Sequence, residues 1–183
     1  MITTWKCCTS RTASRTPYGS CSWPTVSHRC CTPTAADPRT VVRILTEAGW
    51  QPGRRVDTSA WRTQLEAGGF DMHQATERFL AEFGGLTVAH RGPSISQARA
   101  PFELDPLLCL GEDERFADWS SVIHRSLFPL GELDEGRFFL GIDETGEVYL
   151  VADWLASYGP ARQAVEKLIL GVAPDTRWDA YPG

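Results

Sequence analysis

The stretch "GRFFLGIDETGEVYLVADWL", from Gly136 to Leu155, decides the fold class of this chain. Two apolar runs rich in aromatic and β-branched residues, which favour strands, flank the turn-like segment 143–146. In that segment Asp143 can hydrogen-bond its own backbone and Gly146 can adopt positive φ. The stretch therefore predicts a β-hairpin, and "LFPLGEL" just before it predicts a further strand of the same antiparallel meander.

Helical patterns stand on both sides of this meander. "RTVVRILTEAGW" (39–50) and "TSAWRTQLEAGGF" (58–70) repeat apolar residues at helical spacing, and Asp71 is placed to cap a third helix. That third helix has an apolar stripe made of Met72, Thr76, Phe79, Leu80 and Phe83. Short strands are expected at 86–90 and 100–104, followed by an amphipathic helix on Phe116, Trp119 and Ile123, and a last helix within 159–172. The order predicts an α+β fold, with a central, mostly antiparallel sheet flanked by helices at both ends.

The two ends of the chain differ in composition from its centre. Residues 1–37 are rich in Ser, Thr, Cys, Pro and Arg and show no hydrophobic period, which predicts a disordered extension. A translation start placed too far upstream would produce such an extension. Five of the six cysteines lie there, but adjacent cysteines do not easily face one metal ion, so we expect no metal site. Residues 38–173 are expected to form the domain, and 174–183 a loose tail. No apolar run approaches the roughly 20 residues of a membrane span, and no secretory signal is evident, so a cytoplasmic protein is expected.

Charge is distributed unevenly along the sequence. The formal net charge is −5, yet between Glu103 and Asp153 there are 13 acidic residues against three arginines. Such a segment repels nucleic acid and attracts basic proteins. We therefore expect a partner-binding surface made of acidic residues at turns and at a helix start: Glu112, Asp113, Glu114, Glu132, Asp134, Glu135, Asp143 and Glu144.

A catalytic site is not evident in the sequence. Zinc, nucleotide and nucleophile-elbow motifs are absent, and the Ser120-to-His124 spacing lies on a helix that is more simply explained by packing. Asp143 and Glu144 could form a general acid–base pair only if they were buried and close to His90 or His124, because paired catalytic carboxylates need burial to separate their pKa values. As turn residues they are expected to be solvated. We expect a protein that is not an enzyme and needs no cofactor.

Three segments together resemble a known family. "AGWQPGRRVD" (48–57), "FLAEFGGLTV" (79–88) and "GIDETGEVYLV" (141–151) are similar, in this order and spacing, to the third group of the SUKH superfamily of bacterial immunity proteins. The similarity extends from about Thr40 to Val172 and leaves residues 1–37 outside it.

The resemblance implies an α+β domain that binds and neutralises a polymorphic toxin, commonly a nuclease or a deaminase. The partner would be a cognate protein toxin, and the acidic excess predicts that it is basic. A regulatory interaction domain of the same fold, without a toxin, is the alternative. If charge does not guide binding, exposed aromatic residues such as Trp50, Trp119 or Trp154 are the next candidates for the binding face.

Overall fold

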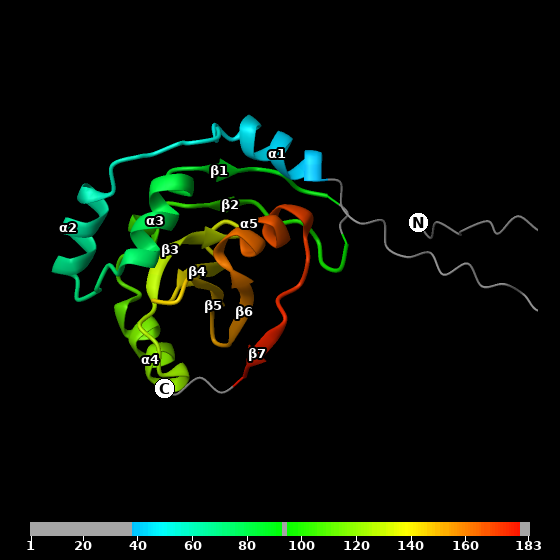
Figure 1. Cartoon of the computed structure of the whole chain (residues 1–183). Helices are drawn as coiled ribbons and strands as arrows, with labels where there is room; N and C mark the ends of the chain where they lie inside the picture. The colour runs from blue at the N-terminus through cyan, green and yellow to red at the C-terminus, as the bar shows by residue number, and fades with distance from the viewer. Residues whose placement is uncertain (1–37, 93–94, 180–183) are drawn as a thin grey trace, which may run out of the picture. The chain divides into compact units, whose positions relative to one another are not determined.

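The computed structural model describes residues 38–92 and 95–179 (Figure 1). The predicted extension, 1–37, lies outside the described residues. The helices are α1 (Pro38–Glu47), α2 (Ser59–Ala67), α3 (Gln74–Phe83), α4 (Asp113–Ile123) and α5 (Ala161–Leu170), and a short 3-10 helix, η1, spans Pro106–Cys109. The strands are β1 (Thr87–Val88), β2 (Phe102–Glu103), β3 (Phe128–Leu133), β4 (Phe138–Ile142), β5 (Glu147–Val151), β6 (Leu155–Pro160) and β7 (Thr176–Trp178).

The seven strands form one sheet in which every strand pairs antiparallel with its neighbours in the chain, in the order β1 to β7. The predicted α+β class and the antiparallel meander are confirmed. Two strands were not predicted. No strand was expected at β6. β7 occupies 176–178, inside the segment expected to be a loose tail, so that expectation is wrong for these three residues.

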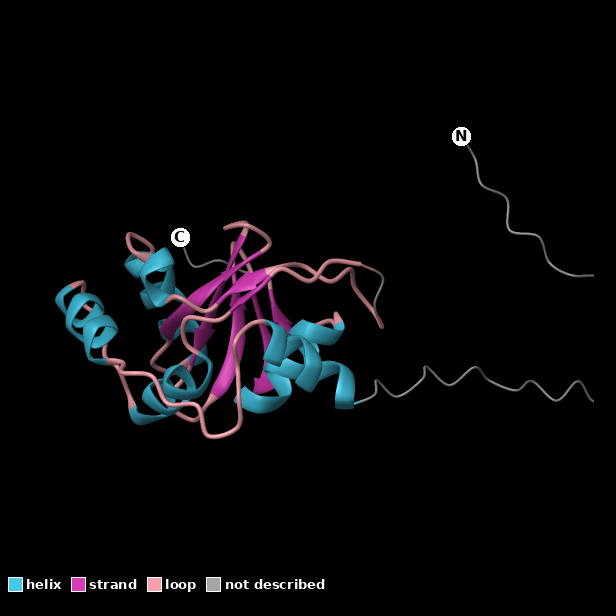
Figure 2. Cartoon of the chain, turned by 90° about the horizontal axis from the view of Figure 1, so that it is seen from above, coloured by secondary structure: helices cyan, strands magenta, loops and turns pink. Residues whose placement is uncertain are grey.

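Helices cover both faces of this sheet (Figure 2). In β5, Val148 and Leu150 join the larger apolar core with α1, α3 and α5, whereas Tyr149 and Val151 join a second core with α4. This alternation follows from the two-residue period of a strand. Because both faces are covered, the meander is apolar on both sides, and four of the five residues of β5 are buried.

Gly141 lets α4 lie close to the sheet. A Cβ atom on this residue would stand 2.9 Å from Cε1 of Phe116, closer than carbon atoms pack. Phe116 and Trp119, the predicted inward residues of α4, are 1% and 0% exposed. Trp119 also donates from Nε1 to the carbonyl of Ala152, 2.9 Å away. Trp119 is therefore part of the core, and its expected exposure as a candidate binding residue is wrong.

The third helix begins differently from the prediction. The N-cap is His73, whose Nδ1 accepts a hydrogen bond from the backbone of Thr76 at 3.2 Å, and the expected cap, Asp71, lies two residues outside. The predicted stripe on this helix is confirmed, since Met72, Thr76, Phe79, Leu80 and Phe83 are all buried. Among the described residues no helix is long and apolar enough to cross a bilayer.

Candidate partner-binding surface

The acidic residues predicted to bind a partner do not form one patch. Asp134 and Glu135 lie in the turn between β3 and β4, whereas Asp143 and Glu144 lie in the turn between β4 and β5. These turns are at opposite ends of β4, a strand of five residues, which is roughly 17 Å long. The acidic residues must therefore be considered as separate groups.

Asp143 is not on the surface, contrary to the expectation of a solvated turn. It is 1% exposed, and its Oδ1 accepts hydrogen bonds from the backbone of Thr145 and Glu147 and from the hydroxyl of Thr145, at 2.6 to 3.0 Å. Its Oδ2 accepts from the hydroxyl of Tyr149 at 3.0 Å. Burial, together with the nearby Asp143 carboxylate, raises the pKa of Tyr149 above its usual range. Asp143 builds the hairpin and cannot contact a partner directly.

Its neighbour Glu144 is exposed but already has local partners. Its carboxylate accepts from the backbone of Ser126 at 2.8 Å and lies 3.6 Å from Arg125 Nη1. Although Asp143 is buried, Asp143 and Glu144 do not form a general acid–base pair, because the Asp143 carboxylate already accepts hydrogen bonds from four donors of its own hairpin.

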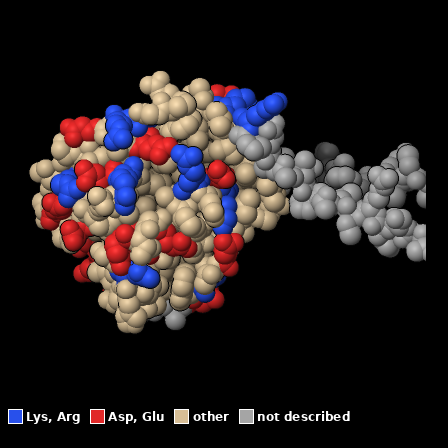
Figure 3. Space-filling model, in the orientation of Figure 1, with Lys and Arg blue, Asp and Glu red and all other residues tan. Residues whose placement is uncertain are grey.

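The β3–β4 turn carries acidic residues that are largely paired. Asp134 and Glu135 both have φ near 58°, a left-handed conformation. Arg91 contacts both carboxylates, at 3.9 and 2.5 Å, and Arg137 lies 3.6 Å from Asp134. Glu132 faces Glu103 across the β2–β3 ladder. On the face seen in Figure 3, acidic and basic side chains stand next to one another in several places, as such pairing requires.

At the start of α4, fewer of the acidic residues are paired with arginine than at the β3–β4 turn. Glu112 is bound by Arg115 at 2.7 Å, and Arg115 also reaches Asp153 at 2.9 Å. Asp113 and Glu114 are exposed, and within the part of the chain that the structure describes neither makes an ion pair. Both lie in the first turn, where the helix dipole stabilises negative charge. Of the eight predicted residues, these two are the freest to receive a basic partner.

A groove of about 510 Å³ runs along α4. Its floor includes Phe70 and Phe116, whose rings meet edge to face with centroids 5.7 Å apart. Acidic side chains border it from three different elements, namely Asp71, Asp113 and Glu144, and His124 and Arg125 close one end. The groove thus combines two phenyl rings with polar and charged side chains, a mixture that protein-binding surfaces also show.

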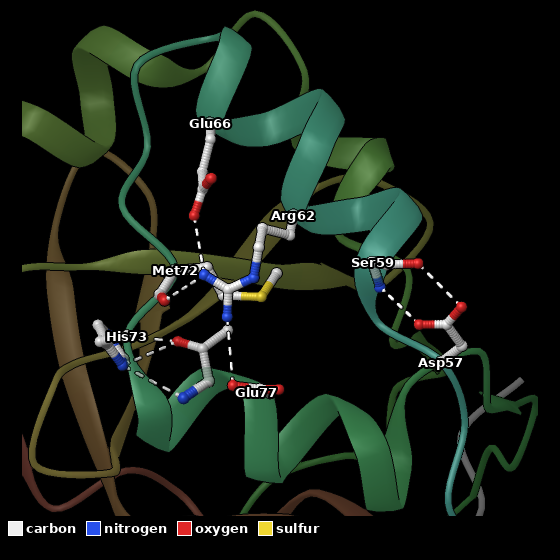
Figure 4. Close-up of polar contacts among 8 residues, drawn as sticks. Asp57, Ser59, Arg62, Glu66, Met72, His73 and Glu77 are labelled. Carbon is white, nitrogen blue, oxygen red and sulfur yellow. Dashed lines mark hydrogen bonds and ion pairs between the residues drawn. The ribbon is translucent and has the colours of Figure 1, made fainter.

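One wall of the groove, the loop between α2 and α3, is held in place by Arg62 (Figure 4). The Arg62 guanidinium donates to the Met72 carbonyl at 3.1 Å and contacts Glu66 at 2.9 Å and Glu77 at 3.2 Å. His73 Nε2 lies 3.3 Å from the carbonyl of Ile142, just before the Asp143 turn. These contacts join α2, α3 and the β4–β5 hairpin into one frame. Sequence reasoning missed Arg62, whose partners lie in two other segments.

Residues that could act as nucleophiles have structural partners. The Ser120 hydroxyl donates to the Phe116 carbonyl at 2.7 Å and accepts from the backbone of Leu127 at 3.0 Å. His124 ends α4 in the left-handed conformation. Cys109 is fully buried, and burial raises the pKa of its thiol to about 12. Across residues 38–92 and 95–179 no group of three His, Cys, Asp or Glu side chains could hold a metal ion.

The family described as SUKH-3 immunity protein matches residues 37–171, most of the chain. The chain belongs to the SUKH-3 immunity protein family. This confirms the resemblance drawn from the three sequence segments, all of which lie inside the match. No match was found among curated proteins or among solved structures. SUKH-3 membership indicates a role in toxin immunity, and the geometry of α4 and its groove gives that role a candidate surface on this chain.

Proposed function

We propose that this SUKH-3 protein acts in the cytoplasm, where it binds and neutralises a basic toxin domain of the nuclease or deaminase type, and that the start of α4 and its groove form the contact. The observation that carries the proposal is the unpaired charge of Asp113 and Glu114 beside the groove along α4. Family membership supports the immunity role, and the groove supports a protein partner.

Charge gives the reason for expecting a basic partner. Between Glu103 and Asp153 the chain carries 13 acidic residues and three arginines, and Arg115 and Arg125 are already in ion pairs. Domains that act on nucleic acid present basic surfaces, because they must hold phosphates. An acidic surface steers such a domain into encounter and fixes its orientation. Neutralisation then follows from covering the surface on which the toxin holds its substrate.

We infer that the protein acts by occupancy and not by catalysis. Ser120 and Asp143 are engaged in the hydrogen bonds of their own elements, and the Cys109 thiol is buried with a raised pKa. A nucleophile needs a lowered pKa or an adjacent base. The buried Cys109 thiol does not meet the first condition, and the Ser120 hydroxyl and the Asp143 carboxylate are already hydrogen-bonded, which supports binding as the mode of action without a cofactor.

The test uses the toxin domain encoded by the adjacent gene, purified and mixed with the full chain. Association rates are measured against ionic strength for the wild type, for Asp113→Asn/Glu114→Gln and for Asp134→Asn/Glu135→Gln. The first double variant is expected to slow association about threefold to tenfold at low salt and to flatten the salt dependence. The second removes the same formal charge but from acids already paired with Arg91 and Arg137, so a smaller change is expected.

Three results contradict the proposal. Failure of the wild type to bind the toxin, or to restore growth of cells that express it, removes the immunity role for this pair. Association that is independent of salt removes the electrostatic part. If only the Asp134 and Glu135 variant slows association, the contact lies at the β3–β4 turn instead.

A further inference from the structure

Exposed large apolar side chains gather near the start of α4. Five such residues occur in the described part of the chain, and two of them, Leu108 and Leu110, lie in and directly after η1. Leu108 is 41% exposed and Leu110 is 53% exposed. Single exposed apolar residues are ordinary, but here two are exposed on either side of one buried residue. We call Leu108, Cys109 and Leu110 the LCL ridge.

The backbone under the LCL ridge is fixed. Asp105 caps η1 by accepting from the backbone of Leu107 at 3.1 Å, and the same carboxylate oxygen accepts from Trp61 Nε1 at 3.0 Å. Cys109 is fully buried, and its thiol lies 3.3 Å from the Gly131 carbonyl. The two leucines are therefore held outward on either side of an anchored residue. Groups held in the bound geometry lose little conformational entropy on binding, which favours affinity.

Acidic side chains follow the ridge directly in the chain, at the start of α4. Leu110 stands two residues before Glu112 and three before the unpaired Asp113. Asp113 and Glu114 are exposed and make no ion pair among the described residues. The ridge is thus an exposed apolar segment next to the unpaired carboxylates of Asp113 and Glu114.

We propose that the LCL ridge is the anchor of the toxin-binding surface, and that its occupant is a toxin segment with an apolar hollow bordered by Lys or Arg side chains. This inference rests on the proposed function and deepens it. A second copy of this chain fits less well. A two-fold contact through the ridge would bring Glu112, Asp113 and Glu114 of both copies together, and like charges oppose such a contact.

The experiment measures association and dissociation rates of the full chain with the toxin domain of the adjacent gene. Leu108→Ser and Leu110→Ser are compared with Val42→Ser, an exposed apolar residue of α1 at 51% exposure that lies outside the surface. Each ridge variant is expected to weaken affinity about tenfold or more through faster dissociation, because apolar anchors at the centre of an interface act mainly there. The Val42 variant is expected to bind like the wild type. The loss of affinity caused by each ridge variant is expected to be equal at low and high salt. The effect of Asp113→Asn/Glu114→Gln, in contrast, is expected to depend on salt.

The outcomes separate the two proposals. A wild type that fails to bind the toxin overturns the proposed function and this inference with it. A wild type that binds, with both ridge variants unchanged, overturns this inference alone. Sedimentation of each protein alone provides a further check: a wild-type dimer that Leu110→Ser converts to a monomer would assign the ridge to a second copy and overturn the proposal. Thermal melts confirm that the variants are folded, and Leu110→Gln repeats the test with a side chain of similar size.

Discussion

Replacing Asp143 by Ala is expected to destabilise the domain strongly, although the residue lies in a hairpin turn. The carboxylate accepts four hydrogen bonds, from two groups of Thr145, from the Glu147 backbone and from the Tyr149 hydroxyl. Thr145 is exposed and can turn to water. Tyr149 is 6% exposed, so its hydroxyl would lose its partner inside the protein.

The magnitude follows from these partners. An unsatisfied buried donor costs about 1–3 kcal/mol, and Asp143→Ala leaves the Tyr149 hydroxyl and the Glu147 amide without their acceptor, so a loss of about 3–5 kcal/mol is expected. For a domain of this size that corresponds to roughly 10 °C in Tm. Tyr149→Phe removes one donor and is expected to cost about 1–2 kcal/mol.

Urea unfolding of the two single variants and the double variant measures the coupling. The double variant is expected to lose about 1–2 kcal/mol less than the sum of the single losses, because the two side chains share one hydrogen bond. Glu144→Ala, in the next position but exposed, is the matched control and is expected to cost less than about 1 kcal/mol. A loss below about 1 kcal/mol for Asp143→Ala would refute the reasoning, because surface substitutions fall in that range and the carboxylate would then be solvated.

Three further outcomes are expected. Gly141→Ala places a methyl group 2.9 Å from Phe116, so it should cost about 1–3 kcal/mol in urea unfolding and weaken toxin binding by displacing α4; an unchanged unfolding midpoint would contradict the close packing. The pKa of Cys109 is raised from 9.0 to about 12, so the stability that its neutral thiol contributes is present below about pH 9 and is lost as pH rises toward 12. Between about pH 9 and 12 the free energy of unfolding of Cys109→Ala should therefore decrease less steeply than that of the wild type. Equal decreases in the two proteins would refute the burial of an ionisable thiol at this position. A chain that begins at Pro38 should melt at the temperature of the full chain, since the family match begins only at residue 37; a clear decrease in Tm would show that the first 37 residues contribute to stability.

The elements with a clear period were predictable from sequence. The stripe of α3 is buried as expected, and Val165, Leu168 and Ile169 of the predicted last helix are buried too, because an amphipathic pattern determines which face turns inward. β6 was missed because its small residues and its Gly159-Pro160 end resemble a loop. β7 was missed because a three-residue edge strand depends on its partner and carries almost no pattern of its own.

The candidate surface was less predictable than the fold. Asp143 has the signature of a turn residue, but its burial depends on Tyr149, whose strand partner Gly141 has no side chain. The predicted acids of the β3–β4 turn proved to be paired with Arg91, which is far away in the sequence. Leu108 and Leu110 look like core residues in "DPLLCLG", and only the anchoring of Cys109 turns them outward. Each error concerns a contact between segments, which a local pattern does not record.

The strictly sequential order of the sheet has a consequence for how the domain folds. Each strand pairs with the strands next to it in the chain, so each step of sheet formation closes a loop of modest length and costs little entropy. The distant contacts are made mainly outside the strand ladder, for example between α1 and α5 and between Ser96 and Gly171. Topologies dominated by such local pairing fold quickly for their size. The sheet can therefore grow strand by strand as the polypeptide emerges from the ribosome, and β7, which follows α5 in the chain, is added to the sheet last.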